Sequence, residues 1–170
     1  MANGDEKMTQ GPKAQMRENF REWAAKMRAG YANLGEFVVE FSQLEFTIRV
    51  ALGGALKLPA DLINIVLSLY DFTSLCKVWE LVMTHQQPEK AKEIEAIFNA
   101  CMKVNSERVR VAHGLWSFGS ETLEAVHVSR NSLNAETYFA EPGQLRDLSK
   151  ECQRLLQAIL GFAGAALVMK

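Results

Sequence analysis

Apolar side chains recur every three or four positions along most of this chain, and this spacing constrains its fold more than any other feature. On a helix of about 3.6 residues per turn, such spacing gathers the side chains on one face. The first stripe begins after Pro12 and contains Met16, Phe20, Trp23, Met27, Tyr31, Leu34, Val38, Phe41, Ile48 and Leu52. It predicts one long helix, or two helices that meet at a bend near Gly30 and Gly35.

The remaining stripes predict shorter helices. They cover 62–70, 72–83, 88–114 and a segment from Glu141 to the end of the chain. Between Gly119 and Phe139 the period falls towards two, and a turn rich in Asn and Ser at 130–134 separates two β-prone segments. The sequence therefore predicts an all-α fold: an antiparallel four- to five-helix bundle with a small β-hairpin insertion before the last helix.

Length and composition favour a single domain. A chain of 170 residues buries a sufficient core without metal or disulfides. We assign residues 1–11, which lack periodicity, to a disordered leader and 12–170 to one helical domain. The formal net charge of -1 gives no general attraction for polyanions, so we expect no duplex DNA partner.

The cysteines and the longest apolar run indicate a cytoplasmic protein. Cys76, Cys101 and Cys152 are odd in number and widely spaced, which is typical of reduced thiols in a core. The apolar run at 155–169 is interrupted by Gln157 and is shorter than the roughly 18 residues of a membrane span, so we expect no membrane association. The three histidines lie on different predicted elements, which predicts no metal site.

Two charged residues occupy positions where the stripes require apolar side chains. Arg108 lies in the stripe formed by Ile94, Ile97, Cys101, Val104, Val111 and Leu115, and Glu45 lies between Leu44 and Ile48. Because a buried charge needs a partner, we expect Glu45 and Arg108 to pair between two helices. Such a pair either fixes the packing of the helices or orients Arg108 for chemistry, and both interpretations remain open at this point.

The stretch around Arg108 contains a second group able to act in catalysis. His113 follows five positions later, so it lies about 140° away around the helix. Its side chain ordinarily titrates near neutrality, which suits proton transfer. Lys103 and Arg110 fall roughly on the His113 side, where they form either a cationic rim or an ordinary solvated face.

The segment from Arg108 to Trp116 resembles a known motif. Arg-x4-His followed by Gly-x-Trp is similar to the Arg-x(4–6)-His motif of the HEPN superfamily of all-helical domains. The resemblance extends over about 34–165 and includes the Leu-Glu step at Leu44, the hairpin and the Glu-Pro-Gly-Gln-Leu start of the last helix. Many HEPN nucleases have a polar residue, often Asn, directly after the motif Arg, whereas this chain has Val109.

The resemblance implies a metal-independent endoribonuclease of toxin or defence type that needs no cofactor. Its RNA site would form at a homodimer interface, and an antitoxin would be a further partner. Arg108 and His113 would be catalytic, Glu45 would orient Arg108, and Arg110 and Lys103 would bind substrate. The alternative is a catalytically inactive, dimeric helical adaptor or regulatory binding module, as many HEPN domains are.

A two-fold axis beside His113 would bring two copies of the Arg and His together. On this hypothesis the contact between the copies uses the apolar residues next to the histidine, namely Met102, Val109 and Trp116.

Overall fold

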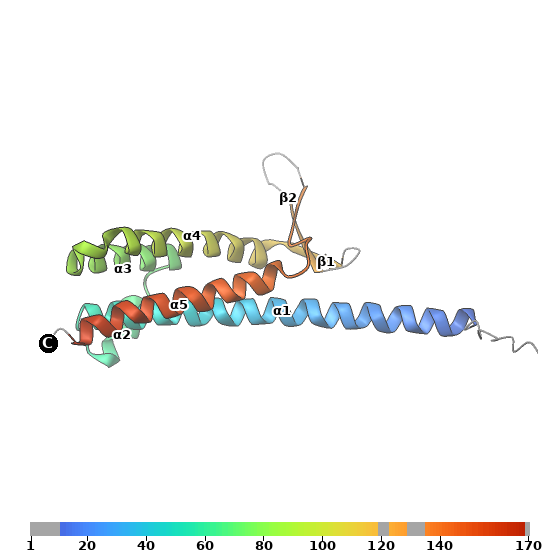
Figure 1. Ribbon diagram of the computed structural model, residues 1–170, viewed down its shortest axis with the longest axis horizontal. Coiled ribbons are helices and arrows are strands. Elements are labelled where there is room, and N and C mark those ends of the chain that lie inside the picture. Colours follow the sequence, from blue (N-terminus) through green and yellow to red (C-terminus); the bar gives the residue numbers. More distant parts are fainter. Residues whose placement is uncertain (1–10, 119–122, 129–134, 169–170) are drawn as a thin grey trace, which may run out of the picture.

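The computed structural model describes residues 11–118, 123–128 and 135–168. In this part of the chain it contains five α-helices, one short 3₁₀ turn and one sheet (Figure 1). The leader expected at 1–11 lies, except for Gly11, outside the described residues, and so does the turn expected at 130–134. The broad all-α class is confirmed.

The bounds of the elements follow the predicted stripes closely. In chain order they are α1 (Pro12–Ala55), α2 (Ala60–Leu67), α3 (Phe72–Gln86), the 3₁₀ turn η1 (Pro88–Lys90), α4 (Ala91–His113), β1 (Leu115–Phe118), β2 (Leu123–Val128), β3 (Ala135–Tyr138) and α5 (Gln144–Val168). The first stripe folds as one uninterrupted helix, so Gly30 and Gly35 do not divide it. Pro12 occupies its first turn, where the absent N–H group would lack a helical partner in any case.

Helices α1, α3 and α5 run in one direction and α4 runs in the other (Figure 1). α5 lies along the C-terminal half of α1, where Gln153 Nε2 donates a hydrogen bond to Glu40 Oε1 at 2.8 Å. α3 and α4 form the second layer over this pair. The core between the layers contains, among others, Phe37, Phe41, Leu44, Ile48, Leu75, Trp79, Ile94, Ile97, Leu155, Ile159 and Phe162.

The three cysteines are free and buried in this core, as predicted. Burial raises the pKa of the Cys152 thiol to about 12. The neighbouring Cys101 thiol and burial together raise the pKa of Cys76. All of these shifts favour neutral thiols, which are poor nucleophiles.

The β insertion has three strands, so the prediction of a hairpin was wrong. The antiparallel sheet has the order β1-β2-β3, with Trp116 opposite Ala125 and Ala125 opposite Tyr138. We expected Leu115 to be the last core position of the preceding helix, but it starts β1 and is exposed. The alternating pattern begins here because Trp116 and Phe118 are partly buried while Leu115 and Ser117 face solvent.

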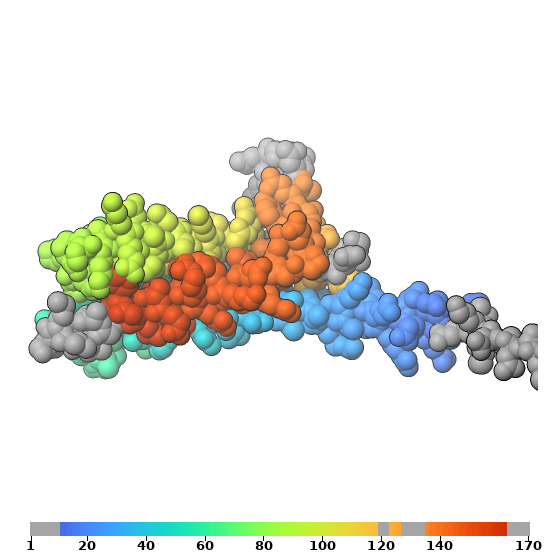
Figure 2. Space-filling model, viewed as in Figure 1, coloured from blue at the N-terminus to red at the C-terminus, as the bar shows by residue number. Residues whose placement is uncertain are grey.

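The N-terminal half of α1 projects past the other helices and the sheet (Figure 2). The last residues of this half to meet the sheet are Gly30, which lies against Leu123, and Trp23, whose ring lies 6.1 Å from that of Phe118. Among the described residues, no helix by itself has the length and apolar character needed to cross a membrane, although α1 and α2, bent by 119°, meet those criteria as a pair.

Candidate functional site at the end of helix α4

The C-terminal end of α4 is fixed to the sheet by Gly114 and Trp116. A Cβ atom at Gly114 would lie 2.7 Å from the carbonyl oxygen of Arg110 and 2.9 Å from the Cβ of Ala125, so only glycine fits this close approach. The Trp116 Nε1–H donates to the carbonyl oxygen of Val111 at 3.0 Å. The Trp116 ring also stacks on Phe139 at 5.6 Å. The Gly-x-Trp part of the motif therefore has a clear structural role.

His113 is the last residue of α4, and its side chain is exposed. Its position follows directly from the Gly114 approach, because the chain changes from helix to strand at the next residue. Arg108 is also exposed, and its guanidinium lies over the ring of Phe41 in α1, with Cζ 5.7 Å from the ring centroid. Both predicted catalytic residues thus lie at the solvent-facing end of α4.

The predicted pairing of Glu45 with Arg108 was wrong. Glu45 instead accepts a hydrogen bond from Arg49 on the same helix, with Oε1 and Nη2 2.5 Å apart. Arg49 also donates to the carbonyl oxygen of Leu67 at 3.2 Å, which ties α1 to the end of α2. Glu45 therefore does not orient Arg108.

Arg108 is exposed near the point where α4 extends beyond the start of α3, although Val111, one turn later on the same stripe, is buried. α3 begins at Phe72, and Thr73 near its start meets Asn105 of α4 through a hydrogen bond of 3.3 Å. The final two turns of α4 extend past the start of α3 (Figure 1), and there the guanidinium of Arg108 lies over Phe41 of α1. The apolar spacing correctly predicted which face of α4 carries Arg108, but not how much of that face other elements cover.

Arg110 is engaged within its own chain. It forms an ion pair with Glu107, and its Cζ lies 4.3 Å from the ring centroid of Tyr138 in β3. These groups line a hollow of about 630 Å³ that also contains Glu141 and Asp147. Three carboxylates outnumber the single guanidinium there, which makes the hollow unsuitable for a phosphate group.

Lys103 is exposed on the side of α4 that faces α5. Its charge contributes to lowering the pKa of Glu151, although the hydrogen bonds from Arg154 to that carboxylate have the larger effect. Lys103 and Arg110 therefore face acidic groups and do not form a free cationic rim with His113. The spacing of three between Glu107 and Arg110 predicts their ion pair, because residues three apart lie on the same face of a helix. The contact of Arg110 with Tyr138 joins distant residues, and nothing local in the sequence indicates it.

The apolar contact expected beside His113 is largely used within the chain. Trp116 packs on Phe139, and Met102 is partly buried against the core. Val109 is the expected contact residue that remains at the surface, with 43% of its area exposed. It also occupies the position directly after the motif Arg, where a polar side chain is frequent in the family that the sequence resembles.

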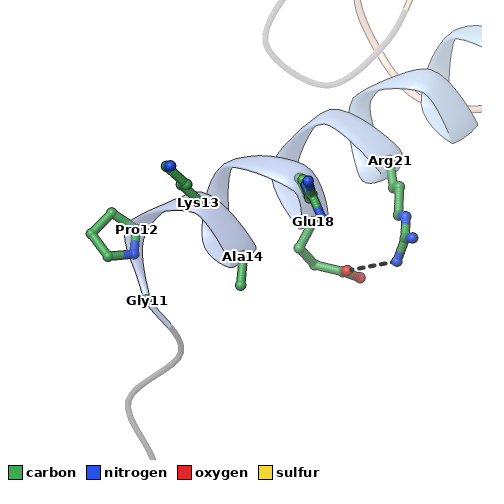
Figure 3. A pocket seen from close by; sticks show the side chains of 7 residues that line it. Gly11, Pro12, Lys13, Ala14, Glu18 and Arg21 are labelled. Carbon is green, nitrogen blue, oxygen red and sulfur yellow. Dashed lines mark ion pairs between the residues drawn. The ribbon is translucent and has the colours of Figure 1, made fainter.

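Elsewhere in the described chain, the start of α1 and the acidic, histidine and cysteine side chains offer no second site. The open hollow beside the start of α1 is lined by residues of its first turns alone, where Glu18 and Arg21 form an ion pair of 3.7 Å (Figure 3). Nothing in it converges on a ligand. Within the described ranges, no group of three or more His, Cys, Asp or Glu side chains is arranged to hold a metal ion.

Comparison of the chain with protein-family models, curated proteins and solved structures gives no match.

Proposed function

We propose that this protein cleaves RNA without a metal ion, using Arg108 and His113 at the end of α4. The observation that supports the proposal is the exposure of both side chains on the last two turns of one helix. In the described part of the chain, neither side chain forms an ion pair or a side-chain hydrogen bond. Both are therefore accessible to a substrate.

The chemistry of the two side chains suits transfer of a phosphoryl group to the neighbouring ribose hydroxyl. Neutral His113 would take the proton of the 2′-hydroxyl as that oxygen attacks phosphorus, and the bond to the 5′-oxygen would break. The imidazolium formed in this way, or that of the second copy, would return a proton to the leaving 5′-oxygen, giving a 2′,3′-cyclic phosphate and a 5′-hydroxyl. Arg108, with fixed charge and several N–H donors, would stabilise the charge on the phosphoryl oxygens.

One chain does not bring these groups together. Five residues of helix separate Arg108 from His113 by about 140° around the axis. The proposal therefore includes a second copy that supplies a second pair of these side chains. RNA is the expected substrate because DNA lacks the attacking hydroxyl.

Incubation of the purified protein with labelled RNA in EDTA tests this proposal. We expect cleavage, and we expect His113→Ala to reduce its rate by roughly 10²–10⁴. His85→Ala is the matched control, because His85 is an exposed histidine at the end of α3, away from α4's last turns. If His113→Ala cleaves RNA as fast as the wild type, or the products lack a 2′,3′-cyclic phosphate, the proposal is wrong.

The second candidate is a catalytically inactive, dimeric adaptor. It is favoured by the ion pairs that occupy Glu45 and Arg110, and by the exposed apolar side chain of Val109. On this proposal Arg108 and His113 are surface residues of a binding face. An intact dimer that leaves RNA uncut in the same assay would support it over the nuclease.

A further inference from the structure

The N-terminal half of α1 carries an apolar stripe that the described part of the chain leaves largely exposed. We call Pro12–Tyr31 the arm. Its stripe side chains Met16, Phe20 and Trp23 are 75%, 66% and 45% exposed. Met27 continues the stripe and is partly buried, and Tyr31 beside it is exposed. The arm is the part of α1 that projects beyond the bundle in Figure 2.

This stripe continues a buried one without a break. From Met16 the spacing alternates strictly between four and three, and the positions are Met16, Phe20, Trp23, Met27, Gly30, Leu34, Phe37, Phe41, Leu44 and Ile48. From Phe37 onward these side chains are buried by neighbouring helices. The sheet covers Gly30 and contacts Trp23 edge-on, and in the described chain it does not extend along the stripe beyond Trp23. The arm thus presents a helix-packing surface whose second helix is missing.

The form of the stripe indicates a helix as the missing partner. A narrow stripe with alternating spacing of four and three is the seam of two paired helices, whereas a helix on a globular or lipid surface has a wider apolar face. The arm is a continuation of α1, and burial of its exposed apolar side chains against a partner would stabilise it. We infer that the arm pairs with the arm of a second copy of this chain, with the two helices antiparallel.

The antiparallel direction follows from the position of the sheet. In a parallel pair, the Gly30 positions of the two copies would lie level with each other, and each is covered by its own sheet, with Leu123 2.8 Å from the position of a Cβ atom. The two sheets would then occupy the same space. In an antiparallel pair, Phe20 of one copy faces Trp23 of the other, and Met16 faces Met27. The two sheets then lie at opposite ends of the seam, which ends at Met16 and Met27, before Gly30.

The charges of the arm permit this pairing. The antiparallel register places Arg17 opposite Ala24 and Lys26 opposite Asn19, so no cation faces a cation across the seam. Glu18 lies on the side of the helix away from the stripe, where it pairs with Arg21 (Figure 3). Self-pairing therefore brings no two cations into direct contact, and the repulsion between the arms, each with five cationic residues and two carboxylates, acts at longer range, where salt screens it.

The area available matches a reversible dimer. Aromatic side chains bury about 150–250 Å² each, and at the exposures given above the stripes of two copies supply roughly 1,000 Å². That is about the lower limit for a specific interface. We therefore expect a dimer that dissociates on dilution. This contact is separate from the one that the nuclease proposal requires at α4. Substitution of Phe20 distinguishes the two, because it changes the arm and leaves α4 as it is.

Sedimentation equilibrium of the full chain over roughly 1–100 μM tests the pairing. We expect the wild type to dimerise, and we expect Phe20→Glu to weaken the dimer at least about tenfold. Ala25→Glu is the matched control, because it places the same charge on the exposed opposite side of the arm and should dimerise like the wild type. Equal dimerisation of Phe20→Glu and the wild type would overturn the inference. So would a monomeric wild type that sediments with vesicles of phosphatidylcholine and phosphatidylserine, because a lipid surface would then be the partner.

Cysteine cross-linking tests the direction. Met16→Cys and Met27→Cys face each other in the antiparallel pair, so a mixture of the two proteins should form a mixed disulfide under mild oxidation. Neither protein alone should form a disulfide dimer, because identical positions lie roughly 16 Å apart along the axis, beyond disulfide reach. The three native thiols are buried and should not interfere. Cross-linking of each protein with itself would instead show parallel arms, and no cross-linking in the mixture would exclude this seam.

Discussion

The two halves of α1 have the same apolar spacing but different surroundings. In the C-terminal half, Phe41 is buried and its ring lies 4.6 Å from that of Phe72 in α3. In the arm, Phe20 occupies the corresponding place on the stripe, and its nearest aromatic contact is Trp23 on the same helix, at 5.8 Å. The difference shows that a stripe determines which face of a helix needs a neighbour, and that other elements determine whether one is there.

The same distinction separates the two ends of α4. Ile94, Ile97 and Cys101 are buried where α3 and α5 lie beside α4. Arg108 follows on the same stripe but beyond the start of α3, and it is exposed. The exposure is local to Arg108, because Val111, one turn further along the same stripe, is buried.

Replacing the two phenylalanines should reveal the largest difference. We expect Phe41→Ala to lower the free energy of unfolding by about 3–5 kcal/mol, because it removes a buried ring and leaves a cavity. Phe20→Ala should lower it by less than about 0.5 kcal/mol at concentrations where the arms are unpaired. Urea denaturation followed by circular dichroism measures both values. Equal losses would mean that the arm belongs to the same folding unit as the body.

Two of the glycines in α1, Gly30 and Gly35, should respond to substitution by alanine with opposite signs. Gly30→Ala should destabilise the fold by roughly 1–3 kcal/mol, since its Cβ would lie 2.8 Å from Leu123 and push the sheet away. Gly35→Ala is the matched control: nothing lies within 4 Å of its Cβ position, and alanine should stabilise the helix by about 0.5–1 kcal/mol. Thermal denaturation of the two variants decides the matter, and a stabilising Gly30→Ala would contradict the close contact with the sheet.

The buried thiols should make the stability of the body depend on alkaline pH. Burial raises the pKa of Cys152 to about 12 in the folded state, whereas an exposed thiol ionises near 8.5. The contribution of the neutral Cys152 thiol to the free energy of unfolding is therefore fully present below about pH 8.5. It is lost as the pH rises towards 12, by about 1.4 kcal/mol per pH unit. Above pH 8.5, the free energy of unfolding of Cys152→Ala should therefore fall less steeply than that of the wild type. Parallel slopes in urea denaturation would show that this thiol is accessible to water when folded.

Much of the fold could be predicted because burial leaves a periodic pattern. The stripes located all the longer helices, and the cysteines on them lie in the core. Strand β1 was not predicted, because Leu115 fits both the end of a helical stripe and the start of an alternating strand. Only the close approach of Gly114 to Ala125 decides between them, and that contact joins residues distant in the sequence.

The candidate site was less predictable, because its side chains depend on where neighbouring elements end. The position of His113 followed from the helix stop at Gly114. The partner of Glu45 could not be predicted in this way. Arg49, four residues away on the same helix, and the distant Arg108 are both possible ion-pair partners, and the apolar spacing does not decide between them. The local partner holds Glu45 because it is already on the same helix face.

Alanine substitution of Arg49 and Arg108 should lower the free energy of unfolding by different amounts, and the smaller loss should be at Arg108. Arg108 is exposed, and in the described chain its side chain makes a cation–π contact with Phe41. Arg108→Ala should therefore lower the free energy of unfolding by at most about 1 kcal/mol. Arg49 is partly buried and links Glu45 to the carbonyl oxygen of Leu67, so Arg49→Ala should cost roughly 1–3 kcal/mol. Urea denaturation of both variants at neutral pH gives the comparison. A loss at Arg108 that exceeds the loss at Arg49 would mean that Glu45 exchanges its partner in solution and that the two charges meet between the helices after all.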